Sequence, residues 1–275
     1  MAGKESIPKI IHYCWVGGGP LSDDVIHYIQ TWKEKCSGYQ IIEWNSTNFD
    51  MNINPFVSEA YASKKWAFVS DYVRLYVLYN YGGIYLDTDV EVVKEFDKFL
   101  DNPAFIGFES KSRLGTAIIG SKKENPWIKH LLSYYDNKHF LEDGIMDMTP
   151  NPIIITDLTV AKYGLEQNNS FQEIDDLLVI YPQEYFSPKD VQTGIVSSTI
   201  NTHTIHHFSA SWCDESRKMY NAEKLEITER HPWIMRLNKT EIGCGLLSKI
   251  IPAWAVYNVS GFKVLVKKII EEFKR

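Results

Sequence analysis

The chain has 275 residues and carries 29 Lys and Arg against 35 Asp and Glu, which gives a formal net charge of −6 at pH 7. Its 44% hydrophobic and 13% aromatic residues are typical of a globular protein with a packed core and exclude an intrinsically disordered one. The mild acidity, with no dense cluster of Lys and Arg in the first two hundred residues, argues against a nucleic-acid-binding protein.

The alternation of apolar runs with helical periodicity predicts strands and helices in turn along the first half of the chain. Val25, Ile29 and Trp32 recur at helical spacing after a capping serine, Ser22. The pattern predicts strands over 7–16, 39–44 and 84–86, and helices over 22–35, 56–64 and 66–81. Gly82 and the glycine after it end the last of these helices.

The second half predicts strands within 105–120, helices over 125–135 and 151–163, and a strand-like segment over 200–212. Strands that alternate with helices favour an α/β fold with a mostly parallel sheet. In such sheets, ligands bind beyond the carboxyl ends of the strands.

The cysteines and the start of the chain indicate where the protein works. Cys14, Cys36, Cys213 and Cys244 are scattered and form no C-x-x-C pair, so we expect neither a disulfide framework nor a structural metal site. No signal peptide and no apolar run of about eighteen residues is evident, and we therefore expect a soluble, cytoplasmic protein.

Asp87-Thr88-Asp89 follows a buried apolar strand and is the sharpest chemical feature of the sequence. Residues i and i+2 of a strand point to the same side, and burying two carboxylates together is costly unless a cation compensates their charge. Oxygen ligands of this kind suit Mg²⁺ or Mn²⁺. The alternative is a solvated pair of carboxylates at a strand end, which is common by chance.

Four segments together resemble the DXD-containing sugar-transferase family, which includes bacterial capsular-polysaccharide glycosyltransferases and yeast initiating mannosyltransferases. They are IPKIIHYCWVGG at 7–18, EWN at 43–45, FVSDYVRLYVLYNYGGIYLDTDVEVV at 68–93 and IHHFSASW at 205–212. The chain also looks like a minimal version of the catalytic domain of large clostridial glucosylating toxins. The resemblance covers about residues 7–212.

The resemblance implies a GT-A fold, a nucleotide-sugar donor, dependence on Mn²⁺ or Mg²⁺, and retention of the anomeric configuration. In the family pattern, Asp87 contacts the ribose or a metal-bound water, and Asp89 ligates the metal directly. His206 matches a third metal ligand, although a lone strand histidine is more often a satisfied core or surface residue.

The resemblance also implies donor-binding roles for several side chains. Asp71 and Arg74 match residues that contact the donor sugar and its phosphate; from their spacing alone they could form an ordinary ion pair within a helix. Trp15 matches a tryptophan that stacks on the base, whereas most strand-end tryptophans belong to the core. The remaining candidates for donor contacts are Asn45, Tyr85, Ser211 and Trp212.

The expected organisation is a catalytic domain over 1–212 and a helical extension over 213–275. Residues 7–110 would form the nucleotide-sugar half and residues 111–212 the acceptor-side half. Residues 246–275 carry a net charge of +4, which leaves −10 for the rest, and place lysines beside an apolar stripe at helical spacing. Such a helix fits peripheral binding to an anionic membrane; the alternative is packing on the catalytic domain.

These features predict a cytoplasmic, metal-dependent, retaining glycosyltransferase, with a location at the inner face of the membrane if the tail binds there. It would move a hexose from a UDP-sugar, such as UDP-galactose or UDP-glucose, to a glycan or lipid-linked precursor of a surface or capsular polysaccharide. The alternatives are a nucleotide-sugar hydrolase or nucleotidyltransferase using the same metal site, and a non-catalytic sugar-binding module.

Overall fold

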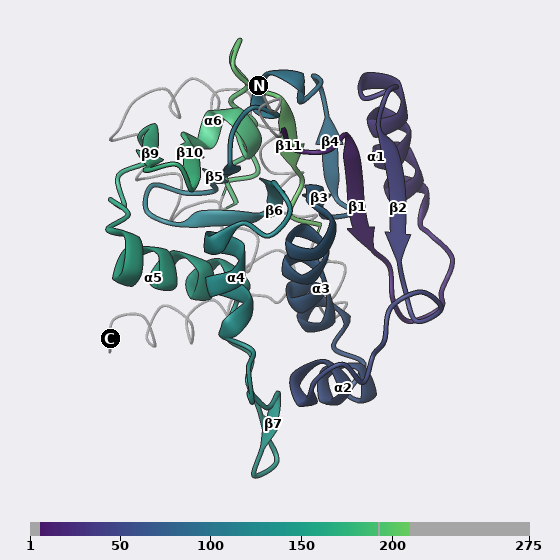
Figure 1. Cartoon of the computed structure of the whole chain (residues 1–275). Helices are drawn as coiled ribbons and strands as arrows, with labels where there is room; N and C mark the ends of the chain where they lie inside the picture. Colours follow the sequence, from purple (N-terminus) through teal and green to yellow (C-terminus); the bar gives the residue numbers. More distant parts are fainter. Residues whose placement is uncertain (1–5, 192, 210–275) are drawn as a thin grey trace, which may run out of the picture. The chain divides into compact units, whose positions relative to one another are not determined.

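The computed structural model describes residues 6–191 and 193–209, and its centre is a seven-stranded sheet in the order β2-β1-β3-β6-β5-β10-β9 (Figure 1). β1 pairs in parallel with β2 and β3, and β5 with β10, whereas β6 and β9 run opposite to their neighbours. Five strands therefore share one direction, which confirms the α/β class with a mostly parallel sheet. The strands are β1 (Ile10–Cys14), β2 (Gln40–Trp44), β3 (Gly83–Leu86), β5 (Ala104–Phe108), β6 (Leu114–Ser121), β9 (Gln172–Ile174) and β10 (Leu178–Tyr181).

Helices cover both faces of this sheet, because its strands are apolar on both sides. On β3, Tyr85 packs into a core shared with α2 to α5, and Ile84 and Leu86 pack into a second core with α1 and α6. This two-sided burial is typical of strands in α/β sheets. The helices are α1 (Asp23–Lys35), α2 (Pro55–Ala62), α3 (Trp66–Tyr81), the 3₁₀ helix η1 (Asp97–Phe99), α4 (Pro126–Ser133), α5 (Asn151–Tyr163) and α6 (Gln183–Phe186).

Capping side chains and glycines set the ends of the helices. Ser22 caps α1 by accepting a hydrogen bond from the Val25 N–H. α3 ends at Gly82, whose φ of +69° an L side chain rarely adopts. A Cβ on Gly83 would lie 2.7 Å from the carbonyl oxygen of Ile10, so glycine is also required for β3 to pair closely with β1.

The structure also has two small two-stranded sheets, and of their four strands only β11 falls within a range predicted as strand. β4 (Val90–Val92) pairs with β11 (Thr204–His206), and β7 (Leu141–Glu142) forms a hairpin with β8 (Ile145–Met146). β9, β10 and α6 were also not predicted. The strand expected over 200–212 is wrong in extent, because within the described part of that range only Thr204–His206 is a strand.

The carboxyl ends of β1 and β3 meet at one edge of the sheet because the two strands are parallel neighbours. Figure 1 shows the arrowheads of β1 and β2 pointing toward the side on which α2 lies. This is the edge at which α/β sheets bind ligands, and the D-x-D segment follows β3 there.

The chain divides into two compact units, Met1–Pro188 with Ser198–His207 and Lys189–Ser197 with Phe208–Arg275. In the described part of the second unit, Lys189 and Val196 form an antiparallel bridge around a turn. The expected boundary at 212, the helical extension over 213–275 and the apolar stripe over 246–275 lie outside the described residues. Among the described helices, none is long and apolar enough to cross a membrane.

His12 is fully buried in β1 and bonds through both ring nitrogens. Its Nε2 lies 2.8 Å from the carbonyl oxygen of Gly82, and the Trp44 Nε1–H donates to its Nδ1 at 3.1 Å. A proton on Nδ1 would face the Trp44 N–H, so only the neutral ring satisfies both partners. Burial lowers the pKa of His12 from 6.5 to about 4, although the hydrogen bond with Gly82 acts in the opposite direction.

We expect the free energy of unfolding to decrease as the pH falls from 6.5 toward 4, because the unfolded chain then protonates His12 while the folded chain does not. The contribution is fully present above pH 6.5 and amounts to about 3 kcal/mol. Urea unfolding at several pH values in this range should show a smaller decrease for His12→Gln than for the wild type. The control is the exposed His27→Gln, which should keep the wild-type decrease; an equal decrease in His12→Gln would contradict this role of His12.

Candidate active site

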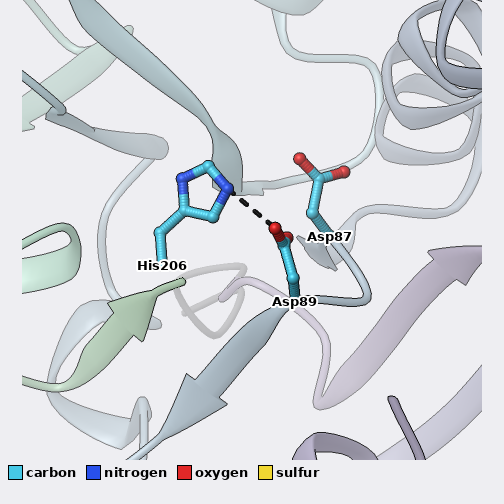
Figure 2. Close-up of side chains that lie close together, drawn as sticks. All are labelled: Asp87, Asp89 and His206. Carbon is cyan, nitrogen blue, oxygen red and sulfur yellow. Dashed lines mark ion pairs between the residues drawn. The ribbon is translucent and has the colours of Figure 1, made fainter. Parts of the chain in front are cut away.

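Asp87, Asp89 and His206 come together at the carboxyl end of β3 (Figure 2). One ligand atom of each residue lies within 4.8 Å of the others. His206 Nε2 lies 3.4 Å from Asp89 Oδ1. The two aspartates lie in the turn that joins β3 to β4 rather than on a strand, and they still approach the same histidine.

The pairing of β4 with β11 brings the histidine to the aspartates across more than a hundred residues of sequence. In this antiparallel pair His206 lies opposite Val90, and the His207 N–H donates to the Asp89 carbonyl oxygen at 2.9 Å. His207 itself bonds Glu91 Oε2 at 2.9 Å, so the two histidines have different partners. Of these two histidines, only His206 belongs to the cluster.

Charge around His206 favours its protonated form. Burial lowers the pKa of the imidazole, but the neighbouring Asp89, Asp87 and Glu109 carboxylates outweigh this effect and raise it above its ordinary value. The carboxylates thus give the surroundings of His206 an excess of negative charge. Two carboxylates and an imidazole at this spacing fit the donor set of a divalent metal ion.

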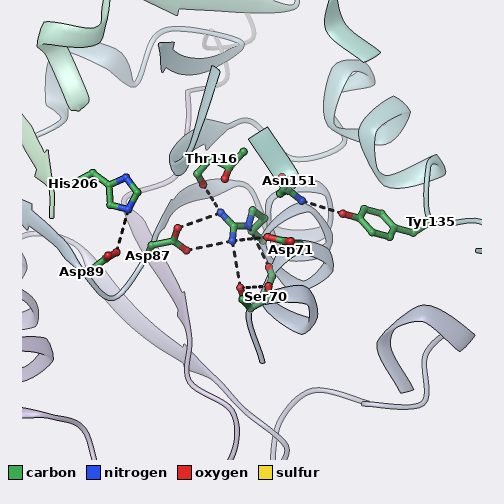
Figure 3. Close-up of polar contacts among 10 residues, drawn as sticks. Ser70, Asp71, Asp87, Asp89, Thr116, Tyr135, Asn151 and His206 are labelled. Carbon is green, nitrogen blue, oxygen red and sulfur yellow. Dashed lines mark hydrogen bonds and ion pairs between the residues drawn. The ribbon is translucent and has the colours of Figure 1, made fainter. Parts of the chain in front are cut away.

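The Arg74 guanidinium lies beside this cluster, because it pairs with Asp87, and all three of its nitrogens form hydrogen bonds or ion pairs. Figure 3 labels its partners Ser70, Asp71, Asp87 and Thr116. Nη2 contacts Asp71 Oδ1 at 2.9 Å and Asp87 Oδ1 at 3.3 Å. Nη1 donates to the Thr116 carbonyl oxygen at 2.5 Å and to Asp87 Oδ2 at 3.4 Å. Nε and Nη2 also reach Ser70, through its carbonyl oxygen and its hydroxyl, both at 3.3 Å.

These contacts tie the helix residues to the D-x-D segment. Arg74 is 3% exposed and Asp71 8% exposed, so the pair is buried, unlike a surface ion pair within a helix. Burial raises the pKa of Asp71 to about 7, although Arg74 acts in the opposite direction. Because the guanidinium donors are used within the protein, Arg74 fixes the carboxylates of Asp71 and Asp87 in position.

Trp15 follows β1 at the same edge of the sheet and is half-buried. Its Nε1–H donates to the Gly19 carbonyl oxygen at 2.8 Å, so the glycine loop folds back beneath the indole edge. Gly17 has a φ of +100°, and a Cβ there would lie 2.8 Å from Nε1 of Trp66. The loop therefore requires glycine, and Trp66, the first residue of α3, lies against it. The sequence analysis did not single out this second tryptophan.

Of the remaining donor-binding candidates, the structure describes Asn45 and Tyr85. Asn45 lies at the end of β2, two strands from β3, and its amide bonds Glu43 and Thr47. Tyr85 is buried in the core, with the Arg74 guanidinium 4.8 Å from its ring centre. Ser211 and Trp212 lie outside the described residues.

Glu109 is a site residue that sequence reasoning missed. It follows β5, and burial raises its pKa to about 7, although the His206 charge acts in the opposite direction. Asp87 and Arg74 also act on this pKa, which places Glu109 near the cluster. A carboxylate directly after an apolar strand was the available signal, the same one that singled out Asp87.

Comparisons with known proteins confirm the resemblance seen in the sequence. The family described as glycosyltransferase sugar-binding region containing DXD motif matches residues 22–106. Inositol phosphoceramide mannosyltransferase 3 of Schizosaccharomyces pombe is 26% identical over 147 residues, which cover 49% of this chain and 40% of that protein. Mannosyl phosphorylinositol ceramide synthase CSH1 of Saccharomyces cerevisiae is 28% identical over 162 residues, 54% of this chain and 42% of that protein. The matches thus span about two fifths of these relatives.

Two solved structures are similar in part. The PaToxG glycosyltransferase is 20% identical with a TM-score of 0.45 and covers 58% of this chain and 71% of its own. A glycosyltransferase involved in the glycosylation of the major capsid of PBCV-1 is 13% identical with a TM-score of 0.43 and covers 81% and 100%. The α/β fold of the present chain rests on its own sheet order.

Proposed function

We propose that this chain, which carries the DXD-containing sugar-binding region of glycosyltransferases, is a metal-dependent, retaining glycosyltransferase of GT-A architecture. It transfers a hexose from a nucleotide sugar, with a UDP-sugar as the first candidate donor. The observation that carries the proposal is the meeting of Asp87, Asp89 and His206 beside the buried Asp71–Arg74 pair.

The chemistry follows from these residues. Asp89 and His206 would hold Mn²⁺ or Mg²⁺ directly and Asp87 would complete the site; the imidazole favours Mn²⁺ because Mg²⁺ prefers oxygen ligands. Such an ion stabilises the negative charge of a leaving nucleoside diphosphate as a Lewis acid. Asp71 accepts hydrogen bonds from donor hydroxyls, and Arg74 keeps both carboxylates aligned.

The nucleotide lies along the glycine loop in this proposal. Trp15 stacks on the base, and the backbone of Gly17 and Gly18 allows close approach of the ligand. Tyr85 acts by supporting the Arg74 guanidinium, and Asn45 by shaping the turn after β2. Ser211 and Trp212 are proposed to contact the diphosphate.

The acceptor is a glycan or a lipid-linked glycan, and a surface or capsular polysaccharide precursor is one candidate. The relative from Schizosaccharomyces pombe is named as an inositol phosphoceramide mannosyltransferase, so mannose donors and lipid-linked acceptors belong in the same test. We propose a cytoplasmic location with peripheral membrane contact through 246–275, a segment outside the described residues.

A donor screen tests the function. The full chain with Mn²⁺ is heated in the presence of UDP-glucose, UDP-galactose or GDP-mannose, since a ligand at 100 times its dissociation constant adds about 2.7 kcal/mol of stability. Products of the stabilising donor are then separated by thin-layer chromatography. We expect sugar linked to an acceptor, with the α configuration of the donor kept in the proton NMR spectrum.

Other outcomes select the alternatives. Free sugar alone, even with acceptor fractions present, indicates a hydrolase, and transfer of the nucleotide portion indicates a nucleotidyltransferase. Stabilisation without any product indicates a binding module. A β-linked product would contradict retention but not glycosyl transfer.

A further inference from the structure

Glu109 directly follows β5, and hydrogen bonds of a short turn hold its backbone in place. Its N–H donates to the Arg113 carbonyl oxygen at 2.9 Å, and the Arg113 N–H donates to Ser110 Oγ at 3.2 Å, so the 109–113 turn closes on itself. Within residues 6–191 and 193–209, no hydrogen bond or ion pair engages the Glu109 carboxylate. The turn thus holds the backbone of Glu109 and leaves its carboxylate available.

The side chain of Glu109 extends over the backbone of β6. A Cβ added to Gly115 would lie 2.9 Å from the Cβ of Glu109 and 3.3 Å from its Oε2. A side chain at position 115 would therefore displace the carboxylate, so Gly115 provides the space in which Glu109 lies.

This place adjoins the groups of the candidate site. The residue after Gly115 is Thr116, whose carbonyl oxygen accepts from Arg74 Nη1, and the carbonyl oxygen of Ala117 accepts from the Asp87 N–H at 2.8 Å. Glu109 therefore lies along the same stretch of β6 that holds Arg74 and Asp87.

Glu109 differs from the other carboxylates of the site, because each of those faces a charged partner. Asp71 is bonded to Arg74, and Asp87 and Asp89 face His206 and the proposed metal. When the bond from the anomeric carbon to the diphosphate breaks, positive charge develops on the sugar ring, and an uncommitted carboxylate beside the ring stabilises that charge.

We propose that Glu109 is a catalytic residue whose carboxylate faces the anomeric carbon of the donor sugar and stabilises positive charge there during transfer. This role rests on the proposed function. It differs from metal binding and from donor-hydroxyl binding, because it acts on the transition state and leaves the affinity for the nucleotide unchanged.

The Glu109 carboxylate takes part in no hydrogen bond or ion pair within the described residues, so its charge adds no contact that stabilises the fold. Glu109→Gln keeps nearly the same volume and removes no such contact. A residue that serves catalysis and not the fold should show activity loss with no loss of melting temperature.

The test uses the full chain with saturating Mn²⁺ and the nucleotide sugar, among UDP-glucose, UDP-galactose and GDP-mannose, that the wild type turns over fastest. Glu109→Gln should lower kcat by about 100-fold and leave KM within about twofold. Its half-saturating Mn²⁺ concentration and its affinity for the nucleoside diphosphate of that donor, measured with Mn²⁺, should equal those of the wild type. Its melting temperature should not fall below that of the wild type. Glu109→Asp should retain part of the activity, since it keeps the charge.

The matched control is Glu142→Gln, on the exposed β7 strand, which should keep wild-type kinetics. Glu109→Gln with the kcat of this control would overturn the proposal. If raising Mn²⁺ above the concentration that saturates the wild type restored the kcat of Glu109→Gln, the residue would have a metal-binding role instead. A lowered melting temperature would indicate a structural role. Either result would overturn the proposal. A wild-type chain that turns over none of the three donors contradicts the proposed function, and the role of Glu109 with it.

Discussion

Asp89→Asn is expected to abolish sugar transfer while leaving the fold intact. The substitution keeps the shape of the side chain and removes one negative charge from the cluster with Asp87 and His206. Metal ions supply several kcal/mol of transition-state stabilisation, so we expect a rate loss of about 1000-fold. Circular dichroism should match that of the wild type, because Asp89 lies in the turn between β3 and β4 and asparagine has nearly the same shape as aspartate.

The metal readout separates this effect from a general loss of activity. Binding of Mn²⁺, followed by the decrease of the free-ion signal in electron paramagnetic resonance, should weaken in Asp89→Asn. Asp101→Asn, an exposed position, is the matched control and should bind Mn²⁺ and turn over donor as the wild type does. Retained activity together with an unchanged Mn²⁺ titration would reject the metal-site hypothesis.

The contiguous part of the site could be predicted from sequence because its residues lie in one helix and the strand that follows. Helical periodicity in α3, the two glycines that end it, and the apolar β3 predict the elements that carry Asp71, Arg74 and Asp87. That these residues share one site was expected from the family resemblance. The register of a short helix–strand unit depends little on the rest of the fold. The family match over 22–106 covers the same segment.

The other contacts of the site depend on long-range pairing that periodicity does not encode. His206 reaches Asp89 only because β11 pairs with β4, two strands of three residues each. Thr116 reaches Arg74 because β6 inserts between β3 and β5. Which strands become neighbours is decided by packing of the whole sheet, so periodicity predicts neither contact. His206 was expected at the metal site only through the family resemblance, and Thr116 was not expected there at all.

The roles of Tyr85 and Asn45 show the same limit. Both follow the family pattern, yet the Tyr85 ring lies under the Arg74 guanidinium and the Asn45 amide bonds its own turn. A match to the family pattern specifies the residue type at a position, whereas the direction of the side chain depends on the residues that pack around it. Their contribution to donor binding stays a prediction.

Arg74→Met is expected to destabilise the folded chain strongly. The guanidinium is buried between Asp71 and Asp87 and also donates to Thr116 and Ser70. Removing one partner of a buried ion pair leaves uncompensated charge, which costs about 3–5 kcal/mol. Arg74→Lys should lose less, because it keeps the charge, but a single ammonium group cannot serve all four residues at once.

Urea unfolding at neutral pH measures these losses. The control is Arg113→Met, whose exposed ion pair with Asp157 at 3.5 Å should cost less than about 1 kcal/mol. Asp71→Asn combined with Arg74→Met should be less destabilised than the sum of the single variants, because each removes the charge that the other leaves unpaired. A loss for Arg74→Met no larger than that for Arg113→Met would mean that Arg74 does not hold the two carboxylates, and its donors would then be free for the phosphate of the donor.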